Sequence, residues 1–219
     1  MSAATRFLGL PSSYLEAVPS RFVAAKNLEF VERRAAGKRL LAYGCYSLAL
    51  RDRGYSCTAI DFDAAPVERA RSQGVDARLV RVGDPIPFED RSFDTVVLFE
   101  TLEKVPDYRF VLSEARRVTR KNVLISVPNC TATPDLARAS ACFDHYLAED
   151  HVNFFTRDEL GEALGAFFSR HEIIEDDYVD PALDKELFPP TLASFLRQLR
   201  RAGFLRRALS YRLFAEAER

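Results

Sequence analysis

The sequence predicts an α/β domain in which helices cover both faces of a mostly parallel sheet. Residues 39–43 and 56–60 are short apolar runs typical of strands, and residues 47–53 between them carry a helical apolar pattern that ends at a glycine. Two strands joined by a short helix, with a glycine turn after the first strand, form a parallel βαβ unit. The second run ends on Asp61. An acid at this position is where nucleotide-binding folds hold a ribose diol.

Composition and charge limit the possible classes of protein. The 219 residues suffice for one domain with appendages, and a hydrophobic content of 47% with 17 phenylalanines can supply a packed core. A net charge of −1 argues against a general nucleic-acid binder, which would be strongly basic. The apolar runs are too short to span a bilayer, and the N-terminus does not resemble a signal peptide. The four cysteines form no Cys-x-x-Cys pair, so we expect reduced thiols in a cytoplasmic protein.

Residues 1–37 are expected to form an N-terminal helical cap, followed by the α/β domain at 38–219. A Ser-x-x-Glu sequence at 13–16 fits a helix-capping box, and Ser20 can begin a second helix. Further strands are expected at 77–82, 95–99, 122–127, 172–179 and 211–217, and further helices at 66–73, at 108–120, and from a Thr-x-x-Glu capping box at 156–159.

Residues 181–206 are expected to be a helical insertion before the last strand. Thr191 can cap a helix there, and the overlapping segment 197–212 holds six arginines and no acid. A basic amphipathic helix can lie on an anionic membrane or bind a partner protein, so a dimer or a hetero-complex through this helix is one possibility. The alternative is a solvated arginine face over a stripe that packs on the domain or on a second subunit.

Four segments of the chain together resemble class I S-adenosylmethionine-dependent methyltransferases, in particular the type 11 group that acts on small molecules, sugars and lipids. These segments read LLAYGC, TAIDFD, VGDPIPFEDRSFDTVVLFETLEKV and EARRVTRKNVLISVPN. The resemblance covers residues 39–129 and extends more loosely to Glu216. It implies a Rossmann-like fold of seven strands in the order 3-2-1-4-5-7-6, with an antiparallel last strand, and S-adenosylmethionine as cofactor.

The resemblance also implies roles for residues at the strand ends. Gly44 would let the backbone approach the cofactor, and Asp61 would hold the ribose. Asp84 would receive the exocyclic amine of the adenine, and Pro85 would pack on the ring.

The chain departs from the family at the turn after the first strand. The family usually has an acid-x-Gly-x-Gly-x-Gly sequence there, whereas this chain has Ala42 in place of the acid and keeps only Gly44. Gly44 and Asp61 are 17 residues apart, and family members have roughly four more, about one helical turn. The simplest interpretation is that the glycine loop has been deleted. Tyr46 would then place bulk where the methionine part of the cofactor should lie.

The acceptor side of the site is expected after the fourth strand. Glu100 is the candidate for a general base, and His151 is a second candidate that can equally brace the loop. Many family members have a histidine in place of Lys104, and the alternative for Lys104 is a solvated ion pair with Glu100. The candidate acceptor-binding residues are Tyr14, Arg21, Lys104 and His145. For the first two, plain packing is the alternative.

Two functions follow from these observations. The first is a methyltransferase acting on a small molecule, a sugar or a lipid-linked intermediate. The second is a non-catalytic relative that serves as a binding or regulatory partner, or that has a repurposed pocket. The geometry of residues 42–48 discriminates between them. Three scattered histidines without ligand spacing predict no metal site.

Overall fold

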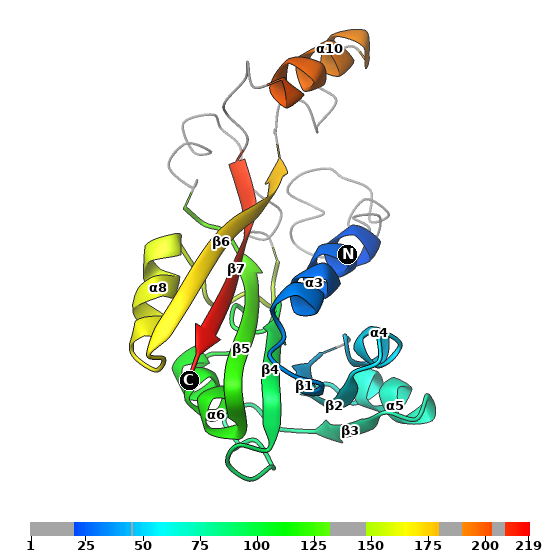
Figure 1. Ribbon diagram of the computed structural model, residues 1–219, viewed down its shortest axis with the longest axis vertical. Helices are drawn as coiled ribbons and strands as arrows, with labels where there is room; N and C mark the ends of the chain where they lie inside the picture. The colour runs from blue at the N-terminus through cyan, green and yellow to red at the C-terminus, as the bar shows by residue number, and fades with distance from the viewer. Residues whose placement is uncertain (1–19, 45, 132–147, 180–189, 203–208) are drawn as a thin grey trace.

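The computed structural model describes residues 20–44, 46–131, 148–179, 190–202 and 209–219, in which helices and strands alternate along most of the chain (Figure 1). The elements are α3 (Ser20–Arg34), β1 (Arg39–Tyr43), α4 (Ser47–Arg51), β2 (Ser56–Asp61), α5 (Ala64–Ser72), β3 (Asp76–Leu79), β4 (Phe93–Phe99), α6 (Tyr108–Val118), β5 (Thr119–Pro128), α8 (Arg157–Gly165), β6 (Arg170–Val179), α10 (Pro190–Arg201) and β7 (Leu209–Glu218).

The seven strands form one sheet in the order β3-β2-β1-β4-β5-β7-β6. Neighbouring strands from β3 to β5 are parallel, and β7 runs antiparallel to both β5 and β6. The predicted fold class, strand order and antiparallel last strand are therefore confirmed. The chain moves outward from β1 to β3 on one side and restarts with β4 on the other. In open α/β sheets, ligands bind at such a switch point, outside the carboxyl ends of the strands.

Helices cover both faces of the sheet (Figure 1). On one face, α3 packs on the central strands through an apolar cluster that includes Phe30 and Phe214, and α4 contributes Leu50 to the same cluster. On the other face, α6 and α8 cover the larger cluster. Successive residues of β1 alternate between the two layers, because Leu40 belongs to the first cluster and Leu41 to the second.

The helices begin where the sequence offers a suitable cap. The Thr156 hydroxyl accepts a hydrogen bond from the Glu159 amide at 3.2 Å, and the Glu159 carboxylate accepts one from the Thr156 amide at 2.9 Å. This confirms the predicted capping box. Among the described residues, α3 extends from Ser20 and α10 from Pro190, so the expected caps at Ser20 and Thr191 stay predictions.

The strand bounds differ most from the prediction at β3. The strand was expected at 77–82, but pairing with β2 ends at Leu79. Beyond it, Val82 is exposed and Gly83 has a positive φ of 89°. The apolar residues after Leu79 therefore belong to the connection that follows the strand, at the same edge as the end of β2.

Helix α10 falls in the predicted insertion and lies beyond the ends of β6 and β7 (Figure 1). In the described part of the chain, no helix is long and apolar enough to cross a membrane. Cys57 and Cys130 are free thiols, and burial raises the pKa of the Cys57 thiol to about 12. Cys45 and Cys142 lie outside the described residues.

Candidate ligand-binding site

Gly44 and Asp61 meet at the carboxyl edge of the sheet, at the ends of the neighbouring strands β1 and β2. Gly44 has a φ of +79°, a conformation that favours glycine, and its amide donates to the Ile60 carbonyl at 3.0 Å. A Cβ built on Gly44 would lie 4.0 Å from the Asp61 Oδ2 atom. The turn after β1 therefore passes directly beside the Asp61 carboxylate.

The Asp61 carboxylate is held by its own strand end. Its Oδ1 atom accepts a hydrogen bond from the Asp63 amide at 2.9 Å, and Asp63 in turn caps α5 by accepting from the Ala65 amide at 3.1 Å. The side chain of Asp61 is half-buried, so its orientation is fixed while it stays accessible. This leaves Oδ2, on the side of Gly44, for a ligand.

An apolar surface lies next to Asp61. Leu79 pairs with Asp61 across β2 and β3 and is 53% exposed, and Val82 is 52% exposed. Asp84 and Pro85 follow and are both exposed. Exposed aliphatic side chains can pack on a flat ring, and carboxylates beside them can accept hydrogen bonds from the edge of that ring. Leu79 therefore lies beside Asp61, and Val82, Asp84 and Pro85 belong to the connection that follows β3.

Tyr46 occupies the other side of the turn after β1. Its side chain is only 8% exposed, and its ring packs edge-on against Phe99 at 5.4 Å between centroids. Its hydroxyl accepts a hydrogen bond from the Asn27 Nδ2 atom of α3 at 2.6 Å. Ala42, in place of the family's acid, is fully buried in the same cluster. The space between α3 and the ends of β1 and β4 is therefore filled by protein side chains.

Glu100, at the end of β4, is engaged with other residues. It has a φ of +51°, its carboxylate pairs with the buried Arg212 guanidinium of β7, and it accepts from the Ser126 hydroxyl at 3.0 Å. Glu100 and Lys104 do not form the ion pair considered above. Glu100 pairs with Arg212, and the Lys104 Nζ atom lies 3.0 Å from Asp150. Burial lowers the pKa of Lys104, but the hydrogen bond to Asp150 and the negative charges of Asp150, Glu103 and Glu100 together outweigh it, so that the pKa is raised.

The loop after β4 is clamped by the segment that contains His151. The Val152 and Asn153 amides donate to the Glu103 carbonyl at 2.8 and 3.0 Å. The Asn153 side chain donates hydrogen bonds to the backbone carbonyls of Leu102, at 2.9 Å, and Val105, at 2.6 Å. The His151 side chain is 10% exposed, beside Asp150. The segment that contains His151 therefore packs against the loop that follows β4.

Glu103 is a buried carboxyl that the sequence reasoning missed. It is 1% exposed, and neither oxygen has a hydrogen-bond partner among the described residues. Burial, together with the negative charge of Glu100, raises its pKa well above the usual range. One signal in the sequence could have indicated this burial, namely the apolar residues Leu102 and Val105 around it.

Several predicted residues cannot be placed at the site. Tyr14 and His145 lie outside the described residues, and Arg21 lies in α3 at a position whose side chain is not described. Among the residues that are described, no three His, Cys, Asp or Glu side chains cluster so as to hold a metal ion.

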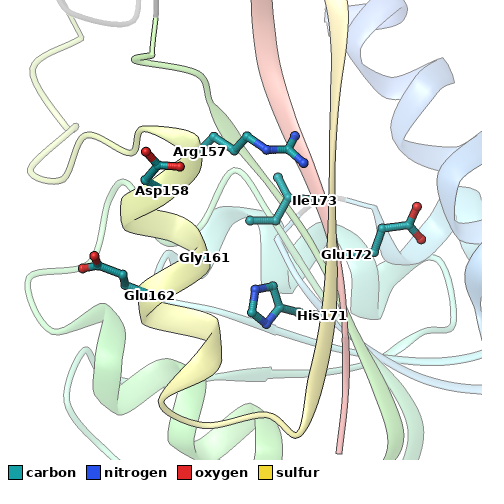
Figure 2. A pocket seen from close by; sticks show the side chains of 7 residues that line it. All are labelled: Arg157, Asp158, Gly161, Glu162, His171, Glu172 and Ile173. Carbon is teal, nitrogen blue, oxygen red and sulfur yellow. The ribbon is translucent and has the colours of Figure 1, made fainter.

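A separate groove lies between α8 and β6, at the sheet edge opposite to β3. Figure 2 shows that His171 and Ile173 point toward α8, while Glu172 points to the other face of β6. Glu172 pairs there with Arg34 at 2.7 Å. The groove is lined by Arg157, Asp158, Gly161, Glu162, His171, Glu172 and Ile173. It contains none of the predicted site residues and is not part of the candidate site.

Comparisons with known proteins show that the chain is similar to methyltransferases. Residues 41–127 match the family described as methyltransferase domain. The chain is similar to a ubiquinone biosynthesis O-methyltransferase of Hahella chejuensis, with 36% identity over 43% of this chain and 44% of the relative. It is also similar to the enzyme of that description from Pseudomonas aeruginosa, with 31% identity over 62% of this chain and 66% of the relative. The matching part of the chain thus covers less than half of the length of the first relative.

Solved structures with low sequence identity share the fold. One is an S-adenosylmethionine-dependent methyltransferase of Thermotoga maritima, described as a possible histamine N-methyltransferase, with a TM-score of 0.63, 16% identity and 90% coverage of both chains. Another is an S-adenosylmethionine-dependent methyltransferase of Archaeoglobus fulgidus, with a TM-score of 0.64, 13% identity, and coverage of 91% of this chain and 94% of the other.

Proposed function

Because this chain belongs to the class I methyltransferase superfamily, we propose that it binds the adenosine part of S-adenosylmethionine, or of a related nucleoside, at the carboxyl ends of β2 and β3. The observation that carries the proposal is the Asp61 carboxylate, held by Asp63 and facing the open turn at Gly44. A ribose diol offers two hydroxyl donors, and a carboxylate can accept from both.

The neighbouring residues suit an adenine ring. Leu79 and Val82 offer exposed apolar surface beside Asp61, where a flat ring can be covered from one side. Asp84 can accept a hydrogen bond from the exocyclic amine, and Pro85 can pack at the edge of the ring. The residues present on this side therefore fit the adenosine half of the cofactor.

Methyl transfer to a small molecule is the activity that the family suggests. One relative is named a ubiquinone biosynthesis O-methyltransferase and another a demethylmenaquinone methyltransferase, which supports a small-molecule acceptor related to quinones. When bound, S-adenosylmethionine supplies an activated methyl group, so that the protein need only orient the acceptor and receive a proton. His151 is the candidate proton acceptor, because Glu100 is engaged with Arg212 and Glu103 is buried with a raised pKa. Tyr14, Arg21, Lys104 and His145 are retained as candidate acceptor contacts.

A non-catalytic function is the second candidate, and a different observation favours it. Tyr46 and Ala42 are buried in one apolar cluster at the turn where the family keeps its glycine loop. A protein with this arrangement can retain nucleoside binding, as a sensor or as a partner of another protein, after losing methyl transfer.

Calorimetry with the purified full chain tests the proposed nucleoside site. We expect 5′-deoxy-5′-methylthioadenosine to bind with a Kd on the order of micromolar, and Asp61→Asn to weaken binding about tenfold or more, because a charge-assisted hydrogen bond is lost. Asp52→Asn, an exposed aspartate that pairs with Arg51, is the matched control and should bind like the wild type. If adenosine, methylthioadenosine, S-adenosylmethionine and S-adenosylhomocysteine all fail to bind at millimolar concentration, the proposal is wrong.

A further inference from the structure

We propose that this site takes an adenine nucleoside that lacks an amino-acid arm at its 5′ position. The inference rests on the proposed nucleoside site, specifies its ligand, and favours the non-catalytic candidate function over methyl transfer. The ligand class is adenosine or a 5′-alkylthioadenosine, in place of S-adenosylmethionine or S-adenosylhomocysteine.

The strand order sets the direction in which a 5′ arm would extend. The edge of the sheet runs through the ends of β3, β2, β1 and β4 in that order. The apolar surface at Leu79 lies at the end of β3, and the candidate ribose acid Asp61 lies at the end of β2. A nucleoside whose base lies on β3 and whose ribose lies on β2 directs its 5′ substituent toward β1 and β4.

Side chains of this chain already fill the space at the ends of β1 and β4. The Tyr46 ring lies edge-on to Phe99, and its hydroxyl is bonded to Asn27, which is completely buried. Ala42 leaves no acid in this cluster. Helix α4, which begins after Tyr46, has five residues and makes no side-chain cap hydrogen bond. An arm of several atoms can enter here only if the Tyr46 ring leaves its position.

The charges of an amino-acid arm would also lack partners at this end. The arm carries an ammonium and a carboxylate, and burying either without a partner is strongly unfavourable. The Gly44 amide already donates to the Ile60 carbonyl. Glu100 and Arg212 pair with each other, with the Arg212 side chain 3% exposed. The Gly44 amide and the Glu100–Arg212 pair are therefore already engaged, in contrast to the exposed groups beside Asp61.

The side-chain amide of Asn27 is only partly hydrogen-bonded. Its Nδ2 atom donates to Tyr46, while its Oδ1 atom is buried with no hydrogen-bond partner among the residues that the structure describes. Asn27 thus keeps its hydrogen bond to Tyr46 although its own Oδ1 atom has no donor. We infer that this bond holds the Tyr46 ring in place.

Two ligands that differ only in the arm provide the test. Methylthioadenosine and S-adenosylhomocysteine are both uncharged at sulfur, and the second adds the amino-acid arm. We expect calorimetry on the full wild-type chain, checked to be free of bound nucleoside, to give a Kd at least about tenfold lower for methylthioadenosine. If S-adenosylhomocysteine binds equally or more tightly, the inference is wrong and the nucleoside site stands. If neither ligand nor adenosine binds, the proposed function itself fails.

Substitutions of Tyr46 test the cause of this selectivity. Tyr46→Ala opens the space, and we expect the ratio of the two Kd values to move at least several-fold toward S-adenosylhomocysteine. Tyr46→Phe keeps the ring and removes only the hydroxyl, so the ratio should stay near that of the wild type. An unchanged ratio in a folded Tyr46→Ala protein would overturn the steric explanation. If that variant does not fold, the two ligands on the wild type still decide the question.

Discussion

The two sides of the carboxyl edge of the sheet differ in whether their side chains are exposed or already paired with other residues of the chain. At the ends of β2 and β3, called here the open side, Asp61 faces a glycine turn, and Leu79 and Val82 are exposed. At the ends of β1 and β4, the closed side, Tyr46 is buried against Phe99, and Glu100 pairs with Arg212. The comparison suggests that the chain has kept one half of a ligand site and used the other half for its own packing.

The largest effect that distinguishes the two sides is expected from Arg212→Met. This change removes the guanidinium that pairs with Glu100 and leaves that carboxylate beside Glu103 without its cation. Removing one partner of a buried ion pair costs about 3–5 kcal/mol of unfolding free energy. Urea unfolding of the variant and the wild type measures this difference.

A matched control uses an exposed arginine of the same chain. Arg53→Met removes an ion pair with Glu32 in which both side chains are more than a third exposed, and it should cost about 0.5 kcal/mol. On the open side, Asp61→Asn should change stability by less than about 0.5 kcal/mol, since no buried partner depends on it. Equal losses in Arg212→Met and Arg53→Met would contradict the comparison.

Glu103→Gln should change how stability depends on pH. Because burial raises the pKa of the Glu103 carboxyl, the folded wild type holds a proton that the unfolded chain releases above about pH 4.3. The contribution of this group to stability is complete below that pH and is lost as the pH rises toward the folded-state pKa. Glutamine does not titrate, so the variant should gain stability relative to the wild type as the pH rises.

Chemical unfolding between pH 4 and pH 9 checks this prediction. Facing Glu103 are the charges of Glu100, Lys104 and Arg212, and none of these is changed in the variant. Glu68→Gln, at an exposed position of α5, is the control and should follow the wild-type curve. If the plots of unfolding free energy against pH are parallel for the wild type and Glu103→Gln, the Glu103 carboxyl has the same pKa in the folded and unfolded states, and the prediction is wrong.

The fold and the open side of the site could be predicted from the sequence because both follow from local patterns. Alternating apolar runs and helical patterns predict the parallel sheet, and the turn at Gly44 is linked to Asp61 by one βαβ unit. Neighbouring parallel strands end at the same edge, so residues at their tips meet whatever the rest of the chain does.

The closed side could not be predicted because its contacts join distant parts of the chain. Glu100 and Arg212 are 112 residues apart, and nothing in either segment specifies the other as its partner. Glu100 was therefore considered a free base or a partner of the nearby Lys104. Likewise, the burial of Glu103 depends on the segment around Asn153, which closes over the loop from 50 positions further along the chain.

A smaller effect is expected from Tyr46→Phe, which probes the packing of the closed side without opening it. The variant loses the hydrogen bond from Asn27 and leaves that amide buried with fewer partners. The expected cost is about 1–2 kcal/mol of unfolding free energy, measured by urea unfolding. Asn27→Leu in the same background should recover part of the loss, since both polar groups are then removed. A loss near zero would mean that the Asn27–Tyr46 contact does not hold the ring.

The smallest effect is expected at Lys104, on the rim of the closed side. Its ion pair with Asp150 is solvent-exposed, with the two side chains 43% and 61% exposed. A double-mutant cycle of Lys104→Met and Asp150→Asn should therefore give a coupling energy of about 0.2–1 kcal/mol that weakens in 0.5 M salt. A coupling above about 2 kcal/mol would mean that Lys104 belongs to the buried network with Glu100 and Arg212. The closed side would then extend further out and include the loop after β4 that Asn153 contacts.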